Sequence, residues 1–288
     1  MATNVAIQGQ TTSKARRSFN VASTRTVSLT IIGIWVVVSV LAPLVARSNP
    51  LAQDMANTLG PPSWAHLFGT DQLGRDVFAR VIYGGRTSLP AAIGVVAIGF
   101  VVGTGLGAIA GYSRPWVDEF VMRFTDIFLA FPVFILAMAV AGALGPGIYH
   151  GLIALAIAWW PNYARVARGI VREIKVREYV VAARAAGWRS NSVVLRVILP
   201  NALPPLLVMA AVDIGRAILM FSVLSFLGLG AVPPSPDWGY MVAEGSQAPD
   251  SWWIATAPAL AILSLVFAFN FLGDSVRDDM DPLLRGRR

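Results

Sequence analysis

Six long runs of apolar residues constrain this chain more than any other feature. Each run is close to the roughly 20 residues that a helix needs to cross the hydrocarbon core of a bilayer. Only 14% of the 288 residues are charged, too few to cover the surface of a soluble domain of this length. The predicted fold class is an all-α integral membrane protein with six transmembrane helices, at 27–46, 89–112, 127–144, 148–163, 203–229 and 254–272.

The basic residues predict the orientation of these spans, because cytoplasmic loops of membrane proteins carry an excess of Lys and Arg. With both termini in the cytoplasm, 18 of the 23 basic residues lie on the inner side and four lie in the first outer loop. A cleaved signal peptide is disfavoured, since the first run exceeds the roughly 7–15 apolar residues of such leaders. The domain boundaries follow: a cytoplasmic tail at 1–26, the first span and an outer loop with an amphipathic helix at 27–88, a five-helix core at 89–276, and a cytoplasmic tail at 277–288.

The composition leaves few residues for catalysis, metal binding or nucleic-acid binding. The chain contains no cysteine and only two histidines, which disfavours zinc and thiolate sites. It has no HExxH, GxSxG or GxxxxGK[ST] motif, so neither an intramembrane enzyme of those classes nor ATP hydrolysis by this chain is expected. A stand-alone ion-coupled carrier is an alternative, although repeated halves and broken polar helices at mid-membrane are missing. The net charge of +7 reflects the inward bias of basic residues and predicts lipid contact, with no nucleic-acid partner.

A basic segment, 164–201, lies between the fourth and fifth predicted spans. Basic side chains recur there at spacings of three and four, which predicts a cationic helix face that meets lipid headgroups. These side chains are Arg165, Arg168, Arg172 and Lys175.

A short helix is expected next, over 178–186, and Gly187 is suited to end it. A second amphipathic piece should stop at Pro200. The alanines of the first helix would let another protein approach closely, which predicts a docking surface; the alternative is an ordinary cytoplasmic loop.

The pattern Ala182-Ala183, Gly187 and Leu199-Pro200 resembles the "EAA" coupling loop of ABC importer permeases. Val181 stands where many members have Glu, and Glu178 is a candidate replacement for that acidic group. The resemblance implies that this loop forms a cytoplasmic coupling helix that inserts into a cleft on an ATPase and transmits its motion. It assigns ATPase coupling to Glu178, Tyr179, Ala182, Ala183, Arg184, Ala186 and Gly187.

Further stretches resemble one permease subunit of dipeptide, oligopeptide and nickel importers. They are LFGTDQLGRDVFARVIYGGRTSL at 67–89, LSFLGLGAVPPSPDWGYMVAEG at 224–245 and FAFNFLGDSVRDDMDPLL at 267–284. The resemblance implies the type I ABC importer permease fold in a prokaryotic plasma membrane. It also implies three kinds of protein partner: a second, homologous permease subunit, two ATPase subunits or domains, and an extracytoplasmic solute-binding protein. ATP and Mg²⁺ would bind to the ATPase partners and no cofactor to this chain. Peptides are the substrate class most directly implied, with nickel chelates, glutathione or another small solute as alternatives.

Two local patterns predict further roles. From Thr70, the outer segment is expected to form a surface helix that ends at Gly84-Gly85, with Thr70 or Asp71 as its cap. Arg75 and Asp76 are interpreted as interfacial or capping charges, with a feature of the translocation pathway as the alternative. The second predicted span has a glycine at every fourth position, a device for close helix packing within this subunit or against the partner permease. These glycines are Gly99, Gly103, Gly107 and Gly111.

Asp213 and Arg216 are the only charges well inside a predicted span. Their spacing of three places them on one helix face, where they can pair. Two interpretations stay open: a structural ion pair inside the bundle, or a face that continues through Met220 and borders the translocation path.

Overall fold

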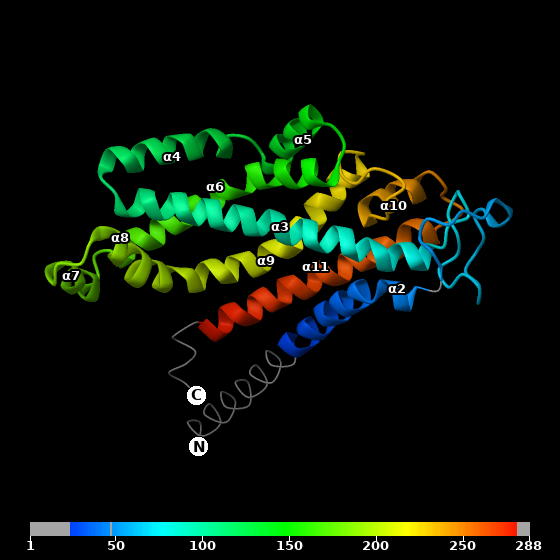
Figure 1. The fold of residues 1–288 in the computed structure, drawn as a ribbon, viewed down its shortest axis with the longest axis horizontal. Coiled ribbons are helices and arrows are strands. Elements are labelled where there is room, and N and C mark those ends of the chain that lie inside the picture. The colour runs from blue at the N-terminus through cyan, green and yellow to red at the C-terminus, as the bar shows by residue number, and fades with distance from the viewer. Residues whose placement is uncertain (1–23, 47, 281–288) are drawn as a thin grey trace, which may run out of the picture.

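The computed structural model of this chain describes residues 24–46 and 48–280. Within those residues the chain is helical, with no β-strand and one isolated bridge between Thr70 and Asp76. The long helices run beside one another in an elongated bundle (Figure 1). The helices are an N-terminal helix described over Thr24–Val40, α2 Ala42–Val45, the 3₁₀ turn Met55–Asn57, α3 Val77–Tyr112, α4 Pro115–Leu129, α5 Val133–Leu144, α6 Ile148–Ile174, α7 Glu178–Ala185, α8 Ser190–Val193, the π-helical turn Val194–Ile198, α9 Leu199–Phe226, α10 Trp238–Ser246 and α11 Trp253–Met280.

The predicted all-α membrane fold is confirmed. Three helical rods in the described part of the chain are long and apolar enough to cross a membrane: α3, Ser190–Phe226 and Trp253–Asp278. α4 and α5 have that composition only as a pair. The N-terminal helix is shorter over its described residues, and α6 is long but carries basic residues in its C-terminal half.

The third predicted span, 127–144, is not one straight helix. α4 ends at Leu129 and α5 begins at Val133, with Pro132 at its N-cap. Proline disfavours the helical conformation of the residue before it and supplies no N–H to the helical ladder. The two helices therefore meet at a break and bend by 82°.

The structure also corrects the predicted surface helix that starts at Thr70. Helix α3 begins at Val77, where the Asp76 side chain accepts a hydrogen bond from the Ala79 amide at 2.8 Å. It then continues through Gly84 and Gly85 to Tyr112. A Cβ at Gly84 would lie 2.7 Å from the Trp238 ring, so this glycine permits close packing and does not end the helix.

α3 and α6 pack so closely that glycine is the only residue type that fits at parts of their contact. A Cβ added at Gly103 would overlap the carbonyl oxygen of Trp160, and one added at Gly107 would overlap that of Ala164. Gly99 and Gly111 also face α6. The four-residue spacing of these glycines therefore lies along an intrasubunit helix contact.

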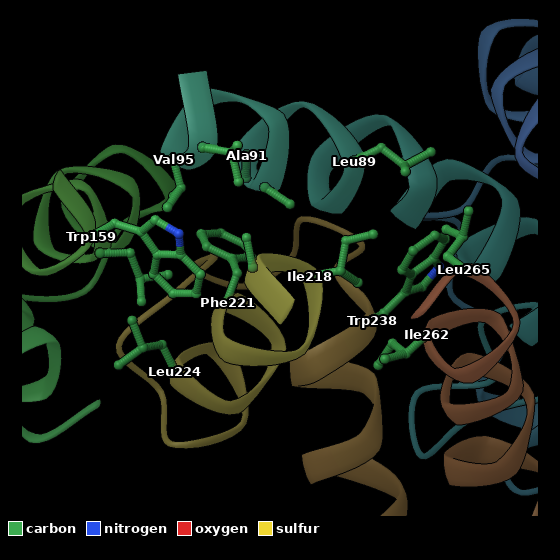
Figure 2. Close-up of a cluster of buried hydrophobic side chains, with 14 of the residues drawn as sticks. Leu89, Ala91, Val95, Trp159, Ile218, Phe221, Leu224, Trp238, Ile262 and Leu265 are labelled. Atoms are coloured by element: carbon green, nitrogen blue, oxygen red, sulfur yellow. The ribbon is translucent and has the colours of Figure 1, made fainter. Parts of the chain in front are cut away.

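Large side chains fill the centre of the bundle where α3, α6, α9, α10 and α11 meet. In Figure 2, Trp159 and Phe221 lie beneath α3 at one end of this cluster, and Trp238 lies near Ile262 and Leu265 at the other. The Trp238 indole N–H also donates to the Val81 carbonyl at 2.8 Å, which satisfies its one polar atom inside the core.

Pro200 does not stop the helix that follows the basic segment. α8, the π-helical turn and α9 form one rod over Ser190–Phe226. Proline is tolerated in a first helical turn, and Pro200 lies directly after the π-helical turn, where the Leu199 amide donates to the Val194 carbonyl. Pro204 and Pro205 follow inside the same rod.

Candidate functional site

α7 and α8 form a hairpin at one end of the bundle (Figure 1). The turn after α7 has the hydrogen bonds of a Schellman motif: the Gly187 amide donates to the Arg184 carbonyl at 3.0 Å, and the Trp188 amide donates to the Ala183 carbonyl at 3.2 Å. Gly187 adopts a φ of +82°, in the left-handed region that glycine enters without steric cost. The predicted helix and its glycine stop are confirmed.

One face of this hairpin packs inward. Val180 is fully buried against Ile174, Val193 and Ile198, and Ala183 packs at the edge of the same cluster. The Arg184 guanidinium donates to the Lys175 carbonyl at 2.9 Å, at the C-terminal end of α6. Ala183 and Arg184 therefore help to hold the hairpin on the bundle.

The other face of the hairpin is open to solvent. Most of the predicted coupling residues are exposed there: Glu178, Tyr179, Ala182, Ala186 and Gly187. Three exposed apolar side chains that the sequence prediction did not include lie beside them, namely Val176, Val181 and Trp188. A tryptophan directly after the glycine stop was the available signal for this apolar surface, which we call the hairpin tip.

The predicted cationic face of α6 is partly neutralised within the protein, because two carboxylates of α4 pair with three of its four cations. Arg165 pairs with Asp126 at 2.6 Å, and Arg168 and Arg172 both pair with Asp118 of α4. Lys175 Nζ donates to the Gly111 carbonyl at 2.7 Å. These contacts fasten α4 and α3 to α6. Contact of the same side chains with lipid headgroups stays a prediction.

Asp213 and Arg216 are paired, but they occupy different environments. Asp213 is buried, and its two oxygens accept from the Trp159 indole N–H at 3.2 Å and from Arg216 Nη1 at 3.4 Å. The Arg216 side chain is 67% exposed, so most of its donors point away from the bundle. Met220 is partly buried against the central core. The arrangement presents one tethered guanidinium on the exposed side of α9.

A buried network of ion pairs lies at the opposite end of the bundle from the hairpin (Figure 1). The spacing of charged residues in the sequence could not predict it. Arg75 bonds to Asp71 and to Glu244 of α10, each at 2.6 Å. Arg80 forms ion pairs with the same two carboxylates, with 2.8 Å between its Nη1 and Glu244 Oε2. Burial alone would lower the pKa of Arg75, but the neighbouring Glu244 and Asp71 carboxylates outweigh it and raise that pKa above its ordinary value. We call these four residues the outer network.

Asp76, beside this network, has a separate role. It caps α3, and its other oxygen contacts His66 Nδ1 at 2.8 Å. The capping interpretation of Asp76 is confirmed, whereas Arg75 is a member of the outer network. No group of three or more His, Asp or Glu residues within 24–46 and 48–280 could hold a metal ion.

Similarity to known proteins identifies the family. Residues 103–286 match the family model described as "Binding-protein-dependent transport system inner membrane component". The chain belongs to that family. It is a membrane permease subunit, and the matched region contains α6, the hairpin and the whole of α9 and α11.

Curated relatives of this permease match over most of their length. The probable D,D-dipeptide transport system permease protein DdpC of Escherichia coli (strain K12) is 42% identical, over 91% of this chain and 88% of that protein. The dipeptide transport system permease protein DppC of Alkalihalophilus pseudofirmus is 40% identical, over 90% and 86%. The glutathione transport system permease protein GsiD of Pectobacterium atrosepticum is 42% identical, over 78% and 75%.

A solved structure supports the fold of the permease. A chain of the inward-facing MetNI methionine ABC transporter superposes with a TM-score of 0.59, covering 70% of this chain and 97% of that chain at 21% identity. The outer network residues 71–80 lie before residue 103, outside the family match, although Glu244 lies within it. The permease therefore joins a family-wide helical core to an outer segment that precedes the family domain.

Proposed function

We propose that this permease forms, with a second homologous permease subunit, the translocation path of an ATP-driven importer for di- and oligopeptides. Two separate ATPase subunits or domains would bind ATP and Mg²⁺ and dock on the hairpin tip. An extracytoplasmic solute-binding protein would deliver the substrate. The observation that carries the proposal is the exposed hairpin, whose second arm continues as the single rod Ser190–Phe226 through the membrane. Movement of a docked ATPase would reach α9 directly through this rod.

The coupling role is best tested with a bulky side chain that leaves the hairpin itself intact. Ala182 is exposed on α7, whereas Ala183 packs inward and any side chain at Gly187 would be strained by its φ of +82°. We expect Ala182→Trp to abolish ATPase co-purification or ATP-driven transport while membrane insertion stays normal. Val166→Trp, on the exposed side of α6, is the matched control. Normal ATPase association together with normal transport in Ala182→Trp would reject the coupling role.

The same proposal includes an orientation. Both termini and residues 164–201 would lie in the cytoplasm of a prokaryotic cell, with 47–88 and 230–253 outside. Because the chain has no cysteine, single cysteines introduced at Ser192 and Ser235 can be labelled in intact cells without background. An impermeant reagent should label only the second. Labelling of the first alone would reverse the topology.

The translocation path is assigned to the exposed side of α9 that carries Arg216. An isolated charge at a helix centre costs about 2.5–3.5 kcal/mol on insertion scales, so this guanidinium is unfavourable against lipid and suits a hydrated or protein-covered surface. Arg216→Gln should lower transport and the ATPase stimulation by loaded binding protein, with complex yield and basal ATPase activity preserved. Arg123→Gln, at an exposed ion pair of α4, is the control. Unchanged transport would remove Arg216 from the path.

Peptides are the proposed substrates because two of the relatives above are named for dipeptide transport. Glutathione is the second candidate, since GsiD is as similar over a shorter region. Nickel chelates are a third. Calorimetry on the partner binding protein with a panel of peptides, glutathione and metal chelates would distinguish these classes.

A further inference from the structure

An apolar cavity lies at the outer end of α11, away from the hairpin tip and from Arg216. Its volume is about 440 Å³, roughly three times that of a 150 Å³ cavity that is known to accept benzene. Its walls come from the N-terminal helix, the outer loop, α3 and α11. The lining residues used below are Trp35, Phe68, Trp252, Trp253, Ala257 and Leu260.

Two walls of this cavity are fixed by hydrogen bonds. The Trp35 indole N–H donates to Ser264 Oγ at 2.9 Å, and its ring makes an edge contact with Trp238. The Trp253 indole N–H donates to the Thr70 carbonyl at 3.1 Å. Because neither ring can turn inward without losing a hydrogen bond, the cavity is a preformed space and not a loosely packed gap.

The tryptophans at one end of the cavity indicate which end lies at the membrane interface. Tryptophans prefer the level of the headgroups, and Trp252 is exposed at the start of α11. Leu260 lies eight residues further along the helix, about 12 Å deeper at 1.5 Å per residue. Its depth and direction match those of an acyl chain in the outer leaflet.

The surface around the cavity has the composition expected of a lipid-facing surface. Neither wall helix carries a charged residue over 26–46 or 251–273. Exposed apolar side chains continue from the cavity along both helices, at Ile34, Val37 and Val40 on one side and at Leu260, Leu263 and Phe267 on the other. The cavity is therefore continuous with the interface between protein and bilayer.

From its lining, depth and continuity with the bilayer surface, we propose that this cavity binds one acyl chain of an outer-leaflet phospholipid. Lipid tails are as apolar as the lining, so the chain gains no hydrophobic transfer energy on entry. Its gain comes from dispersion contacts with the fixed indole walls. The headgroup remains at the level of Trp252, and among residues 24–46 and 48–280 no basic side chain lines the cavity to select its chemistry.

The test uses the assembled transporter in phosphatidylcholine nanodiscs that contain phosphatidylcholine with a photoactivatable diazirine on one acyl chain. After illumination, adducts are mapped by peptide mass spectrometry. We expect more adducts per residue at 252–261 and at Phe68 than at the equally apolar surface of Ile34, Val37 and Val40. Equal densities, or no adducts at the cavity because the partner permease covers it, would overturn the proposal.

Cavity-filling variants add a matched comparison. Ala257→Phe should reduce cavity adducts to the density found at Ile34, Val37 and Val40. Ala257→Val is a smaller change, for use if the phenylalanine variant does not fold, and it should reduce the adducts partly. Leu263→Phe, on the outward side of the same helix, should leave cavity adducts unchanged. Adducts that persist in both Ala257 variants, with assembly intact, would contradict acyl-chain binding. None of these readouts depends on transport, so the test is independent of the proposed function.

Discussion

The two ends of this permease differ in how deeply their paired arginine side chains are buried. At the end opposite the hairpin, Arg75 and Arg80 are almost fully buried between Asp71 and Glu244. At the hairpin end, Arg172 is 47% exposed although it bonds to the buried Asp118.

The difference shows which end has a fixed geometry. A buried ion group is costly to break because the remaining charge has no water to solvate it. Exposed pairs contribute little, since water and salt screen them and their long side chains lose conformational entropy. The outer network therefore fixes the segment 70–76 and α10 in one arrangement. The exposed pairs near the hairpin would be able to re-form in slightly different geometries under the proposed coupling role.

The largest predicted effect is at the outer network. Arg80→Met leaves Asp71 and Glu244 with one cation fewer in a buried site, and we expect a loss of about 3–5 kcal/mol in the free energy of unfolding. Denaturant unfolding of the purified permease complex measures this. Arg86→Met, at an exposed arginine one and a half turns further along α3, is the control and should have little effect. A loss below about 1 kcal/mol, typical of exposed ion pairs, would show that the two ends do not differ.

The second largest effect is expected at the contact between α3 and α6, and it tests whether the two helices are as closely packed as the structure shows. Gly103→Ala places a methyl group against the Trp160 carbonyl, and overpacking of this kind costs about 1–3 kcal/mol. Gly105 lies on the same helix with open space around it. Gly105→Ala should therefore stabilise the helix by about 0.5–1 kcal/mol, the usual gain of alanine over glycine. Effects of the same sign would contradict the close approach of the two helices.

A smaller effect is expected at the hairpin end. Asp118→Asn removes the carboxylate shared by Arg168 and Arg172, whose side chains are partly open to water. Because those guanidinium groups can be hydrated, we expect a loss of only about 1–2 kcal/mol in the free energy of unfolding. The same unfolding titration at low and high salt should show a smaller loss at high salt. A loss as large as that of Arg80→Met would contradict the proposed adaptability of this end.

The smallest effect is expected at a fully exposed pair. Arg123 and Glu119 are one helical turn apart on α4, with side chains 78% and 62% exposed. Arg123→Gln should leave the unfolding midpoint unchanged within error. A clear destabilisation would indicate that α4 has a protein partner in the assembled transporter.

The sequence predicted those parts of the fold that depend on local pattern. Long apolar runs were sufficient to predict α3, α9 and α11 as spans. The helix before Gly187 follows from its helix-forming alanines and a glycine stop. Pro132, Pro200 and Gly84-Gly85 were harder, because a proline or glycine ends a helix in some surroundings and is accommodated in others. Gly84 and Gly85 permit contact with Trp238 and Ser39, which no local pattern encodes.

The same limit applies to the candidate sites. Ala182 and Gly187 belong to one short motif, so resemblance could identify the hairpin. The outer network joins Asp71 to Glu244, 173 positions apart in the sequence, and it forms only when α10 packs against α3. The pairing of Asp213 with Arg216 was predictable from their spacing. Their unequal exposure was not, since it depends on Trp159 of α6.

The first turns of α9 affect how stiff the rod is between the hairpin and the rest of the helix. The π-helical turn at Val194–Ile198 is followed by Pro204 and Pro205, which supply no N–H to the carbonyls of Pro200 and Asn201. Missing backbone hydrogen bonds lower the bending stiffness of a helix at that point. A displacement of the hairpin would therefore change the angle between the hairpin and α9 before it shifted Arg216 along the helix axis. Under the proposed coupling role, the rod would bend at this point when a docked ATPase displaces the hairpin.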